Sequence, residues 1–109
     1  MKKRPARGEV WLINLDPTVG SEIQKTRPCV VISPPEINAH LSVLLVAPLT
    51  SGSRPAPFRV ETVFKGKPGR MLLEQIRAVS TDRFVKNIGE LNSETLKQSL
   101  TILRDLFED

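Results

Sequence analysis

With 109 residues, 39% hydrophobic and 26% charged side chains and a formal net charge of +4, the chain has the composition of a small globular protein, and we expect one domain over residues 1–109. No apolar run approaches the ~20 residues of a membrane-spanning helix, and no apolar segment follows the basic start as in a secretory signal, so we expect a cytoplasmic protein. A single cysteine, Cys29, and a single histidine, His40, exclude an intramolecular disulfide and provide too few ligands for a zinc site, so any chemistry is expected to need no metal.

The predicted elements are mostly short strands that are rich in apolar residues and bounded by proline, glycine or polar residues. Pro34 and Pro48 are expected to end the second and third strands, and a turn is expected at 66–69. Such a run of short strands favours a small barrel. The expected strands are 10–15, 29–33, 41–47, 58–63 and one within 70–79.

Two polar loops and one helix complete the prediction. The loop 20–28 is longer and more polar than a hairpin connection requires, and the loop 50–57 contains prolines. Near the C-terminus, Ser93 before Glu94 has the pattern of a helix N-cap, and apolar residues follow at a helical spacing. These features predict an amphipathic C-terminal helix in a fold that is otherwise mainly β. The spaced apolar residues are Leu96, Leu100, Leu103 and Phe107.

The basic residues are concentrated in the first three quarters of the chain. Residues 1–8 contain four basic and no acidic side chains, and residues 9–79 contain eight basic and six acidic ones. Residues 80–109 have four basic and six acidic side chains. A polyanion such as RNA would fit the basic part, although a solvated basic terminus is common in proteins of every kind.

No common catalytic motif is present, since the sequence has no glycine-rich phosphate loop, no Cys or His pair at metal-ligand spacing and no nucleophile elbow. Cys29 lies within an apolar strand and is expected to be a buried thiol rather than a reactive one. The feature that favours a function is the long polar loop between the first two strands. Its polar side chains are Ser21, Glu22, Gln24, Lys25, Thr26 and Arg27.

Several blocks of the sequence resemble the MazF/PemK family of toxins. The opening of the family is similar to GEVWL at 8–12, LDPTVGSE at 15–22 and TRPCVVI at 26–32. Later blocks of the family are similar to PLTS at 48–51 and LEQIR at 73–77, in the same order and at similar intervals. The resemblance covers residues 7–107 and is specific because the blocks occur as an ordered set.

The resemblance implies an SH3-like barrel of the Kid/CcdB toxin type, which forms a homodimer and cuts single-stranded RNA at short motifs. The implied reaction is attack of the ribose 2′-OH on the neighbouring phosphate, which leaves a 2′,3′-cyclic phosphate and a free 5′-OH without metal or cofactor. It also implies a cognate antitoxin as partner. The alternative is a non-catalytic toxin or nucleic-acid-binding module on the same barrel, as in CcdB relatives.

In this resemblance the family's functional arginine corresponds to Arg27 and its functional threonine to Thr50. A guanidinium offers two parallel N–H donors to the oxygens of a pentacoordinate phosphorane, and a threonine hydroxyl can donate to the same phosphate. Because a guanidinium stays protonated up to pH ~12, Arg27 is expected to stabilise charge rather than to act as a base. Glu22 could orient Arg27 or accept a proton, and His40 is the second candidate base.

Other polar residues are candidates for contacts with RNA. Gln75 and Arg77 are two residues apart and are expected on one face of a single strand, where they would meet RNA or the second subunit. The segment before Gln75 departs from some family members, which have Arg-x-Asp there and use both residues in catalysis, whereas this chain has LLE at 72–74. A second catalytic arginine is therefore missing at that position. The candidate RNA contacts are Ser21, Gln24, Lys25, Ser51, Ser53, Gln75 and Arg77.

Overall fold

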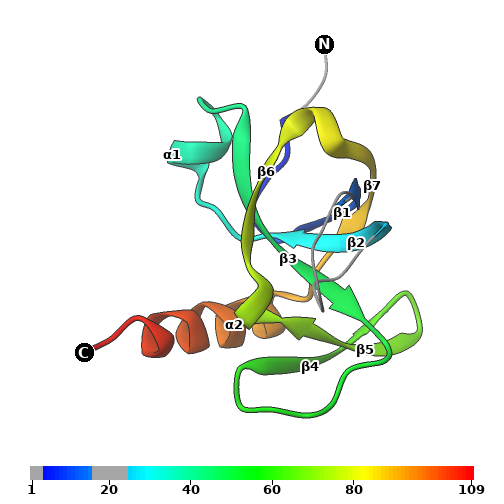
Figure 1. The fold of residues 1–109 in the computed structure, drawn as a ribbon, viewed down its shortest axis with the longest axis vertical. Coiled ribbons are helices and arrows are strands. Elements are labelled where there is room, and N and C mark those ends of the chain that lie inside the picture. The colour runs from blue at the N-terminus through cyan, green and yellow to red at the C-terminus, as the bar shows by residue number, and fades with distance from the viewer. Residues whose placement is uncertain (1–3, 16–24) are drawn as a thin grey trace.

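The computed structural model describes residues 4–15 and 25–109, and within these ranges a seven-stranded antiparallel sheet curls into a half-barrel with one long helix beside it (Figure 1). The strands lie in the order β4-β5-β3-β2-β1-β7, and β6 pairs with β3. The expected fold class, mainly β with a C-terminal helix, is confirmed. The strands are β1 (Glu9–Asn14), β2 (Thr26–Val31), β3 (Val43–Thr50), β4 (Arg59–Phe64), β5 (Lys67–Leu72), β6 (Arg77–Ser80) and β7 (Phe84–Glu90). The helices are α1 (Pro35–Asn38) and α2 (Ser93–Leu106), and the 3₁₀ turns are η1 (Leu73–Gln75) and η2 (Thr81–Arg83).

Strand β3 does not end at Pro48, so the expected end at this proline is wrong. The strand pairs with β6 over residues 43–46 and with β5 over residues 49–50, on the same edge. Pro48 pairs with Cys29 of β2 on the other edge, and on this edge it lies between the two ladders, where a missing N–H removes a hydrogen bond from neither of them. The strand can therefore continue to Thr50, its last residue.

The single strand expected within 70–79 is two strands, β5 and β6, separated by the turn η1. Three consecutive residues, Met71, Leu72 and Leu73, are buried, and a flat strand with one exposed face could not bury all three. The turn expected at 66–69 lies instead at Lys65 and Gly66, whose φ angles of 51° and 77° are those of a type I′ hairpin. Residues 68 and 69 consequently belong to β5.

In the described part of the chain, two hydrophobic clusters form the core, one on each side of the sheet formed by β1, β2 and β3. The first lies under α2 and includes Val30, Met71 and Leu103. The second includes Cys29 and Val46. Cys29 is fully buried, as expected, and burial raises the pKa of its thiol from 9.0 to about 12 although Arg77 lowers it in part.

The C-terminal helix is confirmed, with its cap one residue earlier than expected. The side chain of Asn92, rather than Ser93, accepts hydrogen bonds from the backbone N–H groups of Glu94 and Thr95. Phe107 follows the helix and is 79% exposed, whereas the other three residues of the predicted apolar spacing, Leu96, Leu100 and Leu103, pack on the core. No helix in the described part of the chain is long and apolar enough to cross a membrane.

Candidate functional site

Arg27 and Thr50, which are far apart in the sequence, line the same pocket, whose volume is about 270 Å³. Arg27 is the second residue of β2 and Thr50 is the last residue of β3. The ladder between these strands begins with the pair Cys29 and Pro48, so both residues lie just past the same end of that ladder. The other described residues that line it are Pro28, Leu49, Ser51, Thr62, Phe64, Lys67, Pro68 and Gly69.

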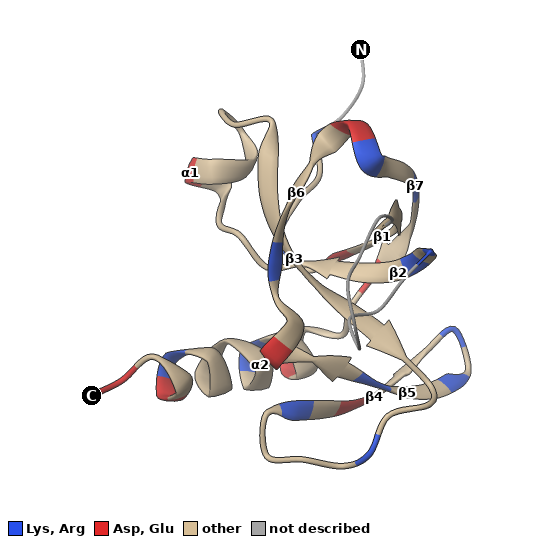
Figure 2. Ribbon diagram, in the orientation of Figure 1, with Lys and Arg blue, Asp and Glu red and all other residues tan. Residues whose placement is uncertain are grey.

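The pocket wall is cationic. Among the described residues that line it, Arg27 and Lys67 are positively charged and none is acidic. Three hydroxyl groups, from Thr50, Ser51 and Thr62, are available as further hydrogen-bond donors. Figure 2 shows basic residues at the start of β2 and around the tip of the β4–β5 hairpin. A ligand with several anionic oxygens, such as a phosphodiester, fits this set of donors.

Lys67 was not singled out by the sequence analysis. It is the first residue of β5, directly after the turn, and it is exposed. The sequence shows a lysine on each side of Gly66, but only the folded hairpin brings Lys67 to the pocket that Arg27 also lines. Pairing of strands that are distant in the sequence cannot be inferred from local composition.

The hydroxyl of Thr50 is oriented by its own loop. Its Oγ1 accepts a hydrogen bond of 3.3 Å from the backbone N–H of Gly52. A hydroxyl that accepts one hydrogen bond keeps its own proton to donate, so Thr50 can donate to a ligand in the pocket. On the neighbouring strand, Thr50 is directly opposite Arg70.

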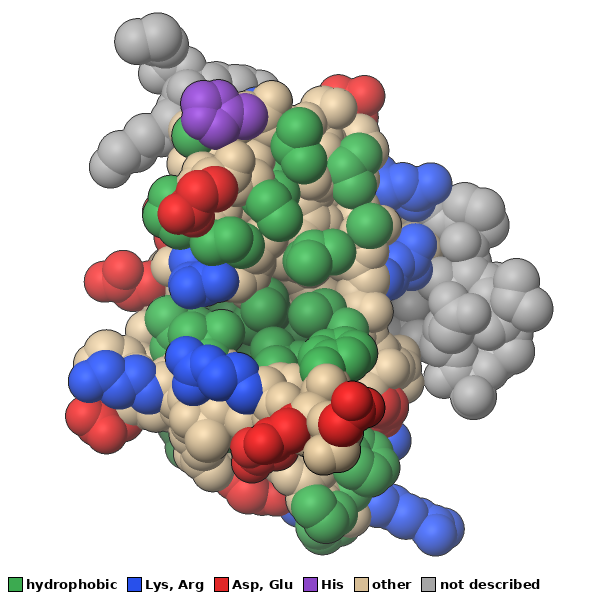
Figure 3. Space-filling view, turned by 90° about the vertical axis from the view of Figure 1, so that its left-hand side faces the viewer, with side chains coloured by type: hydrophobic (Ala, Val, Ile, Leu, Met, Phe, Trp, Pro, Cys, Tyr) green, Lys and Arg blue, Asp and Glu red, His purple; other side chains and the backbone are tan. Residues whose placement is uncertain are grey.

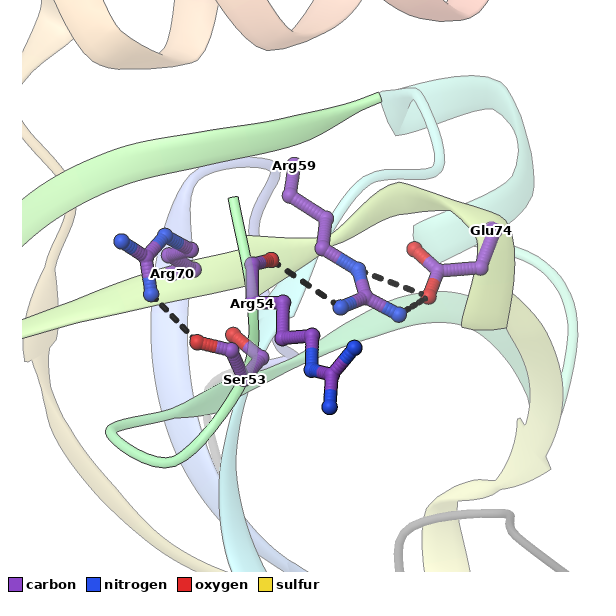
Figure 4. Close-up of polar contacts among 5 residues, drawn as sticks. All are labelled: Ser53, Arg54, Arg59, Arg70 and Glu74. Carbon is purple, nitrogen blue, oxygen red and sulfur yellow. Dashed lines mark hydrogen bonds and ion pairs between the residues drawn. The ribbon is translucent and has the colours of Figure 1, made fainter. Parts of the chain in front are cut away.

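Two arginines hold the loop that follows Thr50 (Figure 4). Arg70 donates to the carbonyl oxygen of Ser53 and to the carboxylate of Glu61, and Arg59 donates to the carbonyl oxygen of Arg54 and to the carboxylate of Glu74. The hydrogen bond to Glu74 raises the pKa of Arg59 above its ordinary value. Glu74, which is in the segment LLE, is therefore the ion-pair partner of an arginine from β4.

The other predicted contacts are distributed over several parts of the molecule. Ser53 lies in the loop after β3, and its Oγ is buried and has no hydrogen-bond partner among the described residues. Gln75 lies in η1 and Arg77 in β6, so the expectation that they share a face of one strand is wrong, because η1 turns the chain between them. Arg77 donates to the carbonyl oxygen of Leu15 at 3.3 Å.

The expected loop 20–28 ends earlier than predicted, because β2 already begins at Thr26 and includes Arg27. Lys25 is exposed immediately before the strand. His40 is exposed after α1 and is not among the residues that line the pocket. The candidates Ser21, Glu22 and Gln24 lie outside the described residues. Within residues 4–15 and 25–109, no three His, Cys, Asp or Glu side chains are placed to hold a metal ion.

A second feature is an apolar face on the opposite part of the molecule from the hairpin tip (Figure 3). Val43 and Leu45 of β3 are 43% and 36% exposed, and Leu41 is 51% exposed. A groove of about 410 Å³ extends from Leu45 to the end of α2, where Phe107 forms part of its wall. Large hydrophobic side chains gathered on one face are typical of a protein–protein interface.

The sequence matches the family model described as the PemK-like, MazF-like toxin of type II toxin–antitoxin systems over residues 6–107. It is 35% identical over 102 residues to the endoribonuclease MazF9 of Mycobacterium tuberculosis, an alignment that covers 84% of this chain and 86% of that protein.

The fold is similar to the crystal structure of MazF from Deinococcus radiodurans, with a TM-score of 0.83, 25% identity and coverage of 96% of this chain and 97% of that one. It is also similar to a mycobacterial endoribonuclease whose structure was solved in complex with its cognate antitoxin, with a TM-score of 0.78 and coverage of 93% and 92%. At 22% identity, the second similarity concerns the fold alone.

Proposed function

This chain belongs to the family of PemK-like, MazF-like toxins of type II toxin–antitoxin systems, and from that membership we propose that it is an endoribonuclease that cuts single-stranded RNA in the pocket of Arg27 and Thr50. The observation that carries the proposal is that Arg27 and Thr50 line the same pocket, whose wall is cationic. A phosphodiester is the group that such a wall recognises. We propose messenger RNA as the substrate and the cytoplasm as the place where the protein acts.

In the proposed reaction, the ribose 2′ oxygen attacks the adjacent phosphorus as its proton is removed, and the bond from phosphorus to the 5′ oxygen breaks as that oxygen gains a proton. The products are a 2′,3′-cyclic phosphate and a free 5′-OH. Arg27 stabilises the charge that grows on the equatorial oxygens, and Thr50 donates a hydrogen bond to the same group. No step requires a metal or cofactor. Glu22 remains our candidate for orienting Arg27 or taking a proton.

A binding module on the same fold is the second candidate function. The test is to incubate the pure protein with a long unstructured RNA in EDTA and to analyse the ends of any fragments. Discrete cuts that leave cyclic-phosphate ends would support the nuclease, with Arg27→Ala as the control for a contaminating enzyme. Intact RNA at a large excess of protein would contradict the nuclease and favour the module.

We also propose that the protein forms a homodimer through the apolar face of Figure 3. Val43 and Leu45 alternate with buried residues along β3, so their side chains point away from the core of this chain. A second copy would cover both residues and the groove beside Phe107. Sedimentation should find a dimer for the natural sequence and a monomer for Leu45→Lys. A Leu45→Lys protein that is still a dimer would assign the contact to another face.

The partner of the toxin is a cognate antitoxin, and we propose that an acidic tail of this partner covers the surface that RNA uses. Lys67 and Arg27 offer a peptide carboxylate the same attraction that they offer a phosphate. The test is a titration of Arg27→Ala protein with labelled RNA and then with the antitoxin tail. Simultaneous binding, with neither ligand changing the affinity of the other, would overturn the shared surface.

A further inference from the structure

The loop that joins β3 to β4, residues 51–58, has no strand or α-helix of its own. It starts directly after Thr50 and includes Ser51, and both residues line the pocket. A polar loop without a ladder samples many conformations unless other contacts fix it. The contacts that fix this loop therefore decide whether Ser51 stays in the pocket wall and whether the Gly52 N–H stays in place to orient the hydroxyl of Thr50.

Arg70 holds the loop from β5. Its Nη1 donates to the carbonyl oxygen of Ser53 at 2.5 Å, and its Nε donates to a carboxylate oxygen of Glu61 at 2.5 Å. The side chain of Arg70 is 22% exposed, whereas that of Glu61 is 69% exposed. One guanidinium thus joins the loop backbone to the neighbouring strand β4.

Arg59 makes the same kind of connection to the next residue of the loop. Its Nη1 donates to the carbonyl oxygen of Arg54 at 3.1 Å, and its Nε donates to Glu74 at 3.0 Å. Glu74 belongs to η1, and the Arg59 side chain is 22% exposed. Two arginines therefore hold the carbonyl groups of two consecutive residues (Figure 4), and each arginine also donates to a carboxylate.

We propose that Arg59 and Arg70 are positioning residues of the ribonuclease, which hold loop 51–58 so that Thr50 and Ser51 face the scissile phosphate. The inference rests on the proposed function. Neither arginine lines the pocket of Arg27. Glu74 and Glu61 support this role because each accepts a hydrogen bond from one guanidinium, Glu74 from Arg59 and Glu61 from Arg70. The segment LLE at 72–74 thus contributes a carboxylate to loop anchoring.

The alternative role for two arginines near an RNA site is direct contact with phosphate groups, and the two roles respond differently to lysine. A phosphate contact needs mainly the positive charge, which Arg70→Lys preserves. An anchor needs two donors at a fixed angle, one for the carbonyl and one for the carboxylate, and an ammonium group on a flexible stem does not supply that geometry. Salt provides a second distinction, because each lost phosphate contact lowers the salt dependence of binding.

The experiment compares Arg59→Gln, Arg59→Lys, Arg70→Gln and Arg70→Lys with the natural sequence and with Lys97→Gln, an exposed residue of α2 outside the pocket. For each protein we would measure cleavage of one RNA, RNA affinity over a range of salt, and amide hydrogen exchange along the chain. The exchange data show whether a variant has lost the loop alone or the whole fold. If a glutamine variant does not fold, the lysine variant of the same arginine is used for the comparison.

We expect both the glutamine and the lysine variants to lose roughly 10- to 100-fold in kcat, the scale of a misplaced catalytic group. Exchange should rise only within 51–58, and the slope of log affinity against log salt should not change. Full activity of Arg70→Lys, or a slope reduced by about 0.7 per arginine, would overturn the proposal in favour of phosphate contacts. Unchanged exchange in 51–58 would overturn it as well. Absence of cleavage by the natural sequence would count against the proposed function, whereas the exchange result would still decide the anchoring.

Discussion

Gly69 passes so close to Thr50 that a methyl group on Gly69 would lie 2.8 Å from the carbonyl oxygen of Thr50. The contact joins β5 to the end of β3, beside the pocket that both residues line. Because the obstructing atom belongs to the backbone, it cannot move away as a flexible side chain would. The absence of a side chain at this position therefore sets the distance between the hairpin and the threonine.

Gly69→Ala should consequently push Thr50 and the hairpin apart. We expect a loss of about 1–3 kcal/mol in the free energy of unfolding, as for other overpacked sites, and a fall in cleavage rate of roughly 100-fold. Denaturant unfolding and initial cleavage rates measure the two effects. Normal activity in a destabilised Gly69→Ala protein would mean that the spacing does not matter for the chemistry.

Arg27→Lys should separate catalysis from binding. If Arg27 stabilises charge that develops only in the transition state, lysine retains the attraction for RNA but not the paired donors. We expect cleavage to fall by roughly 100-fold or more and the RNA dissociation constant to change by less than about 3-fold. Equal losses in rate and affinity would identify Arg27 as a simple phosphate anchor.

Replacement of Thr50 by valine tests the hydroxyl at nearly constant shape. Thr50→Val removes the donor in the pocket and the acceptor of the Gly52 N–H. We expect about a 10-fold fall in cleavage rate, which is milder than for Arg27→Lys since one neutral donor is lost. Thr50→Ser keeps the hydroxyl and should recover most of the rate. If the serine and valine proteins are equally slow, the methyl group rather than the hydroxyl is what matters.

Lys67→Gln should weaken RNA binding with little effect on the chemical step. Lys67 lines the pocket from the hairpin side, where we expect it to provide a point charge for a phosphate beside the one that is cut. We expect KM to rise and the slope of log affinity against log salt to fall by about 0.7, with kcat within about 3-fold of normal. Lys97→Gln, with the same charge change elsewhere, should leave the slope as it is. If the slope of log affinity against log salt falls in both proteins, RNA binding depends on the net charge of the protein and not on the position of Lys67.

The buried thiol predicts a loss of stability in alkali. The folded protein holds the Cys29 proton up to about pH 12, whereas the unfolded chain releases it near the reference pKa of 9.0. The contribution of this thiol to stability is therefore complete below the lower value and is lost as pH rises toward the higher one, by about 1.4 kcal/mol per pH unit. Cys29→Ala, although less stable overall because of the cavity, should lose this pH-dependent part. Parallel alkaline curves for the two proteins would contradict a buried neutral thiol.

Local sequence patterns predicted the fold class, most strands and the C-terminal helix, because these depend on periodicity and on turn residues. The errors occur where pairing between distant strands overrides a local signal. Pro48 is a strand-ending residue by composition, but it sits where β3 changes partner. Strand β7 was not predicted, since its exposed pattern FVKNIGE becomes a strand only by pairing with β1.

The family resemblance predicted the central residues of the candidate site. It did not predict the residues that hold the neighbouring loop in place. Arg27 and Thr50 could be named from motifs, and the structure places them in one pocket. The anchoring by Arg59 and Arg70 could not be foreseen, because it depends on backbone carbonyl groups whose direction no sequence pattern encodes. The assumed single strand at Gln75 and Arg77 failed for a related reason, since the turn η1 arises from three buried residues in a row.

Strand β3 is shared between the two parts of the sheet, and this has a consequence for how the protein unfolds. Its first part pairs with β6 and β2, and its last two residues pair with β5. The β4–β5 hairpin cannot detach without exposing Leu49 and Met71, which are 7% and 0% exposed and belong to the main core cluster. The pocket and the core therefore melt as one cooperative unit, and a ligand that touches only the pocket raises the melting temperature of the entire chain.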